Sequence, residues 1–244
     1  MEQRVALITG GARGIGRAVA SALAERGWAV AASYRTSEEQ AKSLEVGLKA
    51  AGKTVAILRA DASDPAAAAA LVRRVEVEFG RIDALINCAG SYHRVGVLEE
   101  SIEGWHSMFN DNLHPVFYLS RAVAPGMMER KWGRIVSFSI AKADQLVGQP
   151  FITAHYIAKV GVLILTRSLA KILAPHGITV NSISPGFIQT GSTPQQEFAQ
   201  LTKNIPAGYV GSPQDAVSVV CYLLSEEARY VNGTNIHLSG AWGI

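Results

Sequence analysis

The chain has 244 residues, of which 48% are hydrophobic and 18% are charged, a composition that excludes a largely disordered protein and supplies a core without disulfides. Its formal net charge of +3, from 23 basic and 20 acidic residues, is too small to indicate a nucleic-acid-binding protein. The two cysteines have no metal-ligand spacing, no apolar run reaches the roughly 18 residues of a membrane span, and no secretory signal pattern is present, so we expect a cytoplasmic protein without bound metal.

Short apolar runs alternate with helical patterns along the chain. Strands are predicted at residues 5–9, 29–34, 55–60, 84–87, 134–139, 179–184 and 235–238. Helices are predicted at residues 16–26, 37–51, 65–79, 102–129, 153–173 and 215–225, the fourth of them interrupted near Pro115. This alternation predicts an α/β fold with one domain over residues 1–244, a doubly wound parallel sheet of about seven strands and helices on both faces. In such folds ligands bind beyond the carboxyl ends of the strands.

A glycine-rich turn lies between the first strand and the first helix. Gly10 permits the tight turn, Gly14 allows the backbone to approach a pyrophosphate, and Gly16 allows the helix to pack on the strand. The helix amino terminus that follows supplies amides and a positive dipole for phosphate. The turn therefore predicts a dinucleotide site, with a spacing of Gly-x-x-x-Gly-x-Gly.

This spacing and several later motifs resemble the short-chain dehydrogenase/reductase family over nearly the whole chain. The motifs are residues 87–90 (Asn-Cys-Ala-Gly), Asn112, residues 133–139, and Pro185-Gly186 with Thr190. The most similar general group is the bacterial 3-oxoacyl-[acyl-carrier-protein] reductases. The resemblance implies a Rossmann fold and a nicotinamide cofactor, bound by Gly10, Arg13, Gly14, Ile15, Gly16, Tyr34, Arg35, Asp61, Ala62, Asn87, Ala89, Gly90, Lys159, Pro185, Gly186, Ile188 and Thr190.

The end of the second strand indicates which nicotinamide cofactor is used. A site for NAD would need a carboxylate there to bind the ribose hydroxyls, but the position holds Tyr34. Arg35 follows it, and Arg13 lies in the glycine turn, so two guanidinium groups can bind a 2′-phosphate. Because no acid competes at this position, we expect NADP(H).

The expected catalytic pair departs from the family pattern. The family places a tyrosine four residues before a lysine, so that both side chains share one helix face. Here Lys159 is fixed by the ungapped match that follows it, and the residue four before it is His155, whereas Tyr156 is only three before it. We assign the tyrosine position to His155 and keep Tyr156 as the alternative, since it points about 100° away on the helix.

The serine position departs as well. The family's catalytic serine aligns with Ile140, and Ser139 lies one residue earlier, where a strand directs its side chain to the opposite face. A bulge could return Ser139 to the site. The candidate catalytic residues are therefore Asn112, Ser139, His155, Tyr156 and Lys159.

Two functions are compatible with these substitutions. The first is an NADP(H)-dependent oxidoreductase that interconverts a carbonyl and a hydroxyl group, with a 3-oxoacyl thioester as candidate substrate and His155 as proton donor. The second is a divergent member with little ketoreductase activity that acts as a dinucleotide-binding sensor or scaffold.

The resemblance also implies a substrate lid, a partner and an oligomer. The lid is expected around residues 187–210, and the substrate is a small carbonyl compound or an acyl thioester, with an acyl-carrier protein as a candidate partner that carries it. Arg130, Lys131 and His176 are candidates for docking that acidic protein. A homotetramer is expected, with an interface around Phe117 and Ile164.

Overall fold

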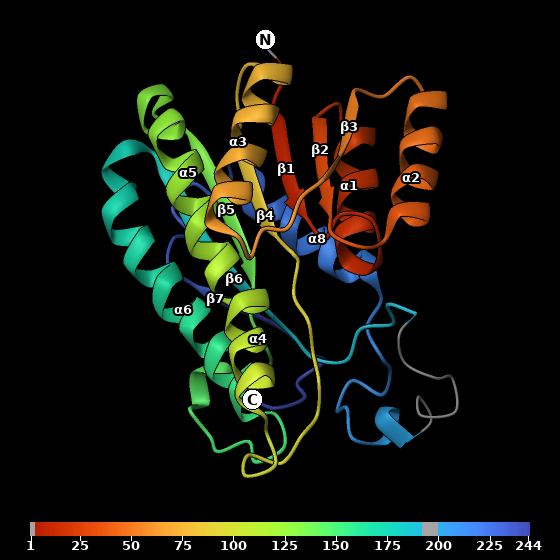
Figure 1. Cartoon of the computed structure of the whole chain (residues 1–244), viewed down its shortest axis with the longest axis vertical. Helices are drawn as coiled ribbons and strands as arrows, with labels where there is room; N and C mark the ends of the chain where they lie inside the picture. Colours follow the sequence, from red (N-terminus) through yellow and green to blue (C-terminus); the bar gives the residue numbers. More distant parts are fainter. Residues whose placement is uncertain (1–2, 192–199) are drawn as a thin grey trace.

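The computed structural model describes residues 3–191 and 200–244 (Figure 1). The strands are β1 (Val5–Thr9), β2 (Ala29–Tyr34), β3 (Val55–Arg59), β4 (Ala84–Asn87), β5 (Gly133–Phe138), β6 (Ile178–Pro185) and β7 (Asn235–Leu238). The α-helices are α1 (Gly14–Glu25), α2 (Glu38–Ala50), α3 (Pro65–Phe79), α4 (Ile102–Asn112), α5 (His114–Arg130), α6 (Thr153–Leu173) and α8 (Pro213–Leu224), and two short 3-10 helices span Ala143–Gln145 and Ala174–His176.

All seven strands form one parallel sheet in the order β3-β2-β1-β4-β5-β6-β7. The predicted doubly wound sheet is thereby confirmed. The chain winds outward from β1 to β3, then returns to place β4 on the other side of β1. The strand order thus reverses between β1 and β4, where ligands bind in folds of this type.

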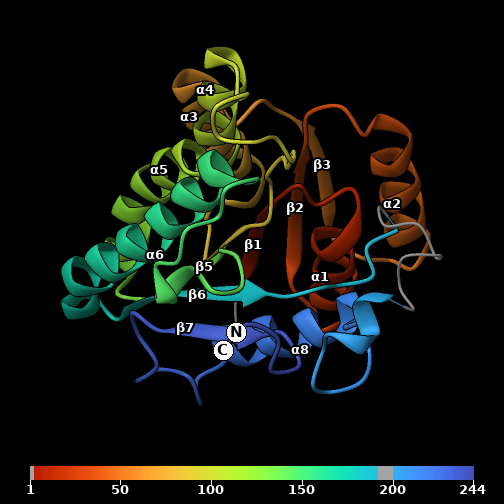
Figure 2. The same cartoon turned by 90° about the horizontal axis from the view of Figure 1, so that it is seen from below.

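The sheet is covered on both faces, as Figure 2 shows. Alternate residues of β1 point to opposite sides because side chains in a strand alternate. Ala6 and Ile8 pack in the cluster that contains α1, α2 and α8 side chains, whereas Val5 and Leu7 pack in the cluster with α3, α5 and α6. Burial on both faces explains why β1, β2 and β4 are largely apolar in the sequence.

The ends of the helices follow local signals in the sequence. Asp64 accepts a hydrogen bond from the backbone of Ala67 and caps α3, whose first residue is Pro65. The predicted helix over residues 102–129 is two helices, α4 and α5, which meet at Leu113 just before Pro115. Pro115 lies in the first turn of α5, a position that tolerates its missing N–H group.

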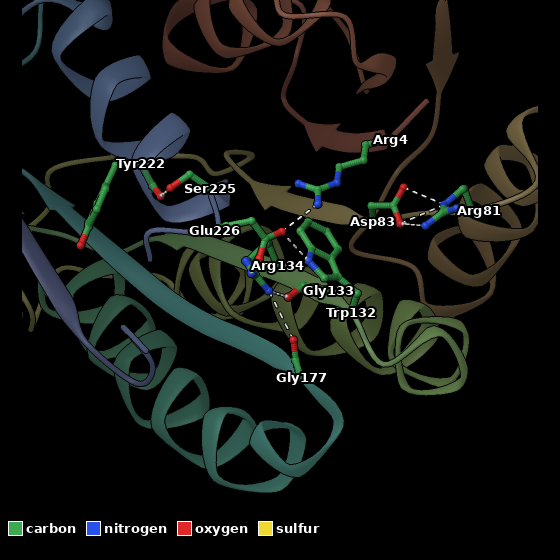
Figure 3. A network of polar contacts seen from close by, with 10 residues as sticks. All are labelled: Arg4, Arg81, Asp83, Trp132, Gly133, Arg134, Gly177, Tyr222, Ser225 and Glu226. Atoms are coloured by element: carbon green, nitrogen blue, oxygen red, sulfur yellow. Dashed lines mark hydrogen bonds and ion pairs between the residues drawn. The ribbon is translucent and has the colours of Figure 1, made fainter. Parts of the chain in front are cut away.

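The amino ends of the strands are held by a polar network (Figure 3). The carboxylate of Glu226 accepts from Arg4 Nη2 at 2.8 Å and from Trp132 Nε1 at 3.0 Å. The guanidinium groups of Arg4 and Arg134 lie 4.0 and 4.4 Å from the Trp132 ring. Beside them, Arg81 is paired with the fully buried Asp83. A pocket of about 380 Å³ lies at this end, lined by residues that include Val5, Arg81 and Arg130, and a larger cleft opens at the opposite end of the sheet.

No helix in the described ranges is long and apolar enough to cross a membrane.

Candidate active site

A cleft of about 860 Å³ opens at the carboxyl ends of β1 to β4. Its wall contains most of the residues predicted to bind the cofactor, namely Gly10, Arg13, Gly14, Ile15, Gly16, Tyr34, Arg35, Asp61, Ala62, Ala89, Gly90 and Thr190. The other five, Asn87, Lys159, Pro185, Gly186 and Ile188, do not line its wall. Asn87 is buried and donates to Ser137 Oγ at 3.1 Å. Gly186 packs against Ser239, and Pro185 and Ile188 lie just before and after Gly186 in the chain.

The glycine turn forms a cradle that side chains would fill. Gly10 and Gly14 have φ values of +62° and +54°, which side chains disfavour. A Cβ on Gly10 would lie 3.0 Å from the Ala89 backbone, and one on Gly16 would lie 2.4 Å from the Gly10 carbonyl oxygen. Helix α1 begins at Gly14, so its free amides face the cleft. These residues fit the pyrophosphate of a dinucleotide.

The adenosine end of the cleft holds an acid that the sequence interpretation missed. Tyr34 and the exposed Arg13 are placed as expected, one at the end of β2 and the other before α1. Arg35, however, is paired with Asp111 of α4, with Nη1 to Oδ1 at 2.7 Å and Nη2 to Oδ2 at 3.2 Å. The end of β2 itself carries no acid, as expected, but a carboxylate from a helix across the cleft competes for Arg35.

Asn112 and Lys159 meet at the end of β4. A Cβ on Gly90 would lie 2.6 Å from Asn112 Oδ1 and 3.4 Å from Lys159 Nζ, so both polar atoms adjoin this glycine. Asn112 donates its amide to the carbonyl oxygens of Met108 and Ser91, and its Oδ1 is buried without a hydrogen-bond partner in the described residues. Lys159 donates to the Phe138 carbonyl oxygen at 2.9 Å.

His155 and Tyr156 point to different neighbours from the first turn of α6. The His155 ring stacks edge-on against Tyr92 at 5.2 Å between centroids, and its Nδ1 is buried without a hydrogen bond among the described residues. The Tyr156 hydroxyl instead donates to the Lys142 carbonyl oxygen at 2.5 Å and accepts from the Val147 amide at 3.3 Å. The phenol of Tyr156 therefore holds the loop before α6.

Burial shifts the acidity of both ionisable groups on this face of α6. Desolvation, followed by the positive charge of Lys159, lowers the pKa of His155 to about 4. Desolvation also lowers the pKa of Lys159 to about 8. At neutral pH the imidazole is neutral, and Lys159 is a cation close to losing its proton.

Comparisons with known proteins agree with this geometry. Residues 10–241 match the family profile described as enoyl-(acyl carrier protein) reductase. The chain is 35% identical over 243 residues to a 3-oxoacyl-[acyl-carrier-protein] reductase FabG of Vibrio harveyi, covering 98% of this chain and 97% of that protein. It is 36% identical over 242 residues to the FabG of Escherichia coli, with 98% and 97% covered.

The chain belongs to the short-chain dehydrogenase/reductase family. The crystal structure of gox2181 superimposes with a TM-score of 0.92 at 31% identity, covering 99% of this chain and 96% of that one. As a member of the family, the protein is an NAD(P)H-dependent oxidoreductase.

The serine region of this dehydrogenase/reductase connects strand β5 to helix α6. Ser139 Oγ donates to the backbone carbonyl oxygen of Lys159 at 2.8 Å, so its hydroxyl joins β5 to α6. Ile140, half-buried, follows it. The Ser139 hydroxyl is thus engaged in a structural bond next to Lys159.

Asp111 and Tyr92 are among the cleft residues that the sequence interpretation did not identify. Asp111 lines the adenosine end, and Tyr92 lines the same cleft while contacting His155. Asp111 precedes Asn112, which the family pattern had identified, but adjacency on a helix does not indicate the distant Arg35. Tyr92 lies two positions after the motif at residues 87–90, and this closeness was the signal in the sequence that could have identified it.

Proposed function

We propose that this enzyme uses NADPH to reduce the 3-oxo group of an acyl thioester to a hydroxyl group. The observation that carries the proposal is the meeting of Asn112 and Lys159 at Gly90, beside a cleft that fits a dinucleotide. The similarity to 3-oxoacyl-[acyl-carrier-protein] reductases over nearly the whole chain supports the choice of substrate.

The chemistry rests on His155 and Lys159. A bound reduced nicotinamide supplies the hydride. The buried His155 Nδ1, in its N–H form, donates a hydrogen bond to the carbonyl oxygen and stabilises the negative charge that develops there. Neutral imidazole is too weak an acid to give up a proton outright, so the proton that completes the hydroxyl comes from the Lys159 ammonium, which is charged below its pKa of about 8.

The rim of the site supports an acyl substrate. The loop after β4 and the loop before α6 are joined where the Val95 amide donates to the Phe151 carbonyl oxygen at 2.9 Å. Tyr92, Val147 and Phe151 expose apolar surface on these two loops. Such a surface favours an acyl chain over a small polar carbonyl compound. The proposed lid, residues 187–210, includes residues 192–199, which lie outside the described part of the chain.

An acyl-carrier protein as the donor of the thioester would dock at this rim. The candidates Arg130, Lys131 and His176 were wrong for that role, because they lie near the amino ends of the strands, where Arg130 donates to the Ile82 carbonyl oxygen. Arg94 is the better candidate, since its guanidinium lies 5.3 Å from the Phe151 ring at the rim.

Turnover measurements test the function. The wild-type protein is assayed for NADPH oxidation with 3-oxoacyl thioesters, on coenzyme A and on acyl-carrier protein, and with simple ketones. We expect oxidation coupled to formation of the 3-hydroxyacyl product. Tight cofactor binding without turnover of any carbonyl would favour the sensor or scaffold instead, an alternative to which the comparisons give no support.

The preference for NADPH can be tested by exchanging the residues at the end of β2. Replacing Tyr34→Asp together with Arg35→Ile supplies a carboxylate for the ribose hydroxyls and removes a phosphate ligand. We expect the ratio of NADPH to NADH affinity to fall at least about tenfold, the loss of one charge-assisted contact. Equal affinities for the two cofactors in the wild-type protein would contradict the proposed preference.

We also propose a homotetramer that uses α5 and α6. Phe117 and Ile164 are 44% and 61% exposed on these helices. Obligate interfaces are large and apolar, and such side chains favour one. Light scattering of the purified protein at micromolar concentration is expected to give a mass four times that of the chain, and a monomer would rule the assembly out.

A further inference from the structure

The Arg35–Asp111 ion pair spans the adenosine end of the cleft. It joins the residue after β2 to the last turn of α4, and both residues line the cleft. The pair is bidentate, and a second acid, Asp61, lies 3.8 Å from Arg35 Nη1. Two parallel hydrogen bonds of this kind give geometric specificity as well as attraction.

The two partners differ in their access to water. The Asp111 side chain is 13% exposed, whereas that of Arg35 is 49% exposed. A carboxylate this buried needs a partner, and Arg35 is the charge that compensates it. The same contact with Asp111 raises the pKa of Arg35. The Arg35 guanidinium can therefore move toward solvent. The Asp111 carboxylate cannot, and it would stay buried without a partner.

A 2′-phosphate would compete with Asp111 for the same guanidinium fork. Two of the phosphate oxygens can accept both hydrogen bonds of the fork, and the group carries about two negative charges, so it can draw Arg35 away from the carboxylate. Asp111 would then remain buried without its partner, which opposes binding. The ribose hydroxyls of NADH carry no charge and leave the ion pair intact.

We propose that Asp111 is a specificity-determining residue that restrains the preference of this enzyme for NADPH by holding Arg35. The inference rests on the proposed use of NADPH. It assigns to α4, an element across the cleft from β2, a part in distinguishing the two cofactors.

Binding of two small probes tests the inference without turnover. Calorimetry measures the affinity of 2′,5′-ADP, which carries the 2′-phosphate, and of 5′-AMP, which lacks it. The proteins are wild type, Asp111→Asn, Arg35→Gln and the double variant, with Glu103→Gln as the matched control because Glu103 is an exposed acid on the same helix. Asp111→Ser replaces Asp111→Asn if circular dichroism shows that the latter does not fold.

We expect Asp111→Asn to tighten 2′,5′-ADP roughly fivefold, the scale of a partly exposed ion pair, and to change 5′-AMP by less than about twofold. Glu103→Gln should change neither, and the Asp111 effect should vanish when Arg35 is glutamine. Equal changes for both probes, or weaker 2′,5′-ADP binding in Asp111→Asn, would overturn the inference. If Arg35→Gln weakens only 2′,5′-ADP while Asp111→Asn has no effect, the inference alone fails. If Arg35→Gln also leaves 2′,5′-ADP unchanged and the wild type does not distinguish NADPH from NADH, the proposed preference fails with it.

Discussion

Replacing Lys159 by methionine is expected to lower kcat for carbonyl reduction at least about 100-fold, the usual contribution of a positioned proton donor. Methionine keeps much of the apolar stem but removes the charge that adjoins Gly90 and the hydrogen bond to Phe138. Lys171→Met is the matched control, because Lys171 is exposed at the other end of the same helix. A kcat within threefold of wild type in Lys159→Met would show that Lys159 takes no part in the reaction.

The same residue fixes the expected pH profile of the wild type. Lys159 must be protonated to act as the acid, and its pKa is lowered to about 8, so kcat should be level near neutral pH and fall as the pH rises through 8. The pKa of His155 is about 4, so no step is expected near the ordinary histidine value. Retained activity up to pH 10 would contradict this assignment.

The double variant His155→Tyr with Ile140→Ser is expected to raise ketoreductase activity. It restores the phenol and the hydroxyl of the family pattern, and one preorganised donor contributes about 10²–10³ in rate. The loop before α6 keeps the geometry that Tyr156 gives it, which limits how well the new donors are placed. The gain should therefore be about tenfold or more, rather than the full contribution of a preorganised donor. It is measured as kcat on a 3-oxoacyl thioester, beside each single variant.

Each single substitution should give less than the pair, because the two donors act on the same oxygen. A double variant that folds and binds NADPH but is slower than wild type would show that the site is adapted to His155. It would contradict the interpretation that His155 merely replaces a lost catalytic tyrosine.

The fold could be predicted closely because its signals are local. Continuous apolar strands indicate a sheet covered on both faces, and Asp64-Pro65 and Pro115 mark helix starts. The glycine turn was predicted equally well, since Gly10, Gly14 and Gly16 perform their functions within one loop. The directions of His155 and Tyr156 follow from helix geometry.

Other parts of the site depend on contacts between distant segments. Asp111 meets Arg35 across the cleft, 76 positions away in sequence, and no periodicity encodes that contact. The pKa of His155 is lowered mainly by burial, and burial depends on packing against Tyr92 and the rest of the fold. Likewise, the bond from Ser139 to the Lys159 backbone depends on how β5 meets α6.

In the proposed reaction His155, and not Tyr156, donates a hydrogen bond to the substrate carbonyl oxygen. The most direct measurement compares His155→Phe with Tyr156→Phe for reduction of a 3-oxoacyl thioester by NADPH, with cofactor affinity measured for both. His155→Phe should lose at least about 100-fold in kcat with little change in NADPH affinity, because a donor to the carbonyl oxygen is gone. Tyr156→Phe should stay within about tenfold of wild type, since its hydroxyl binds only the loop at Lys142 and Val147. The opposite ranking, with Tyr156→Phe inactive and His155→Phe active, would contradict the account.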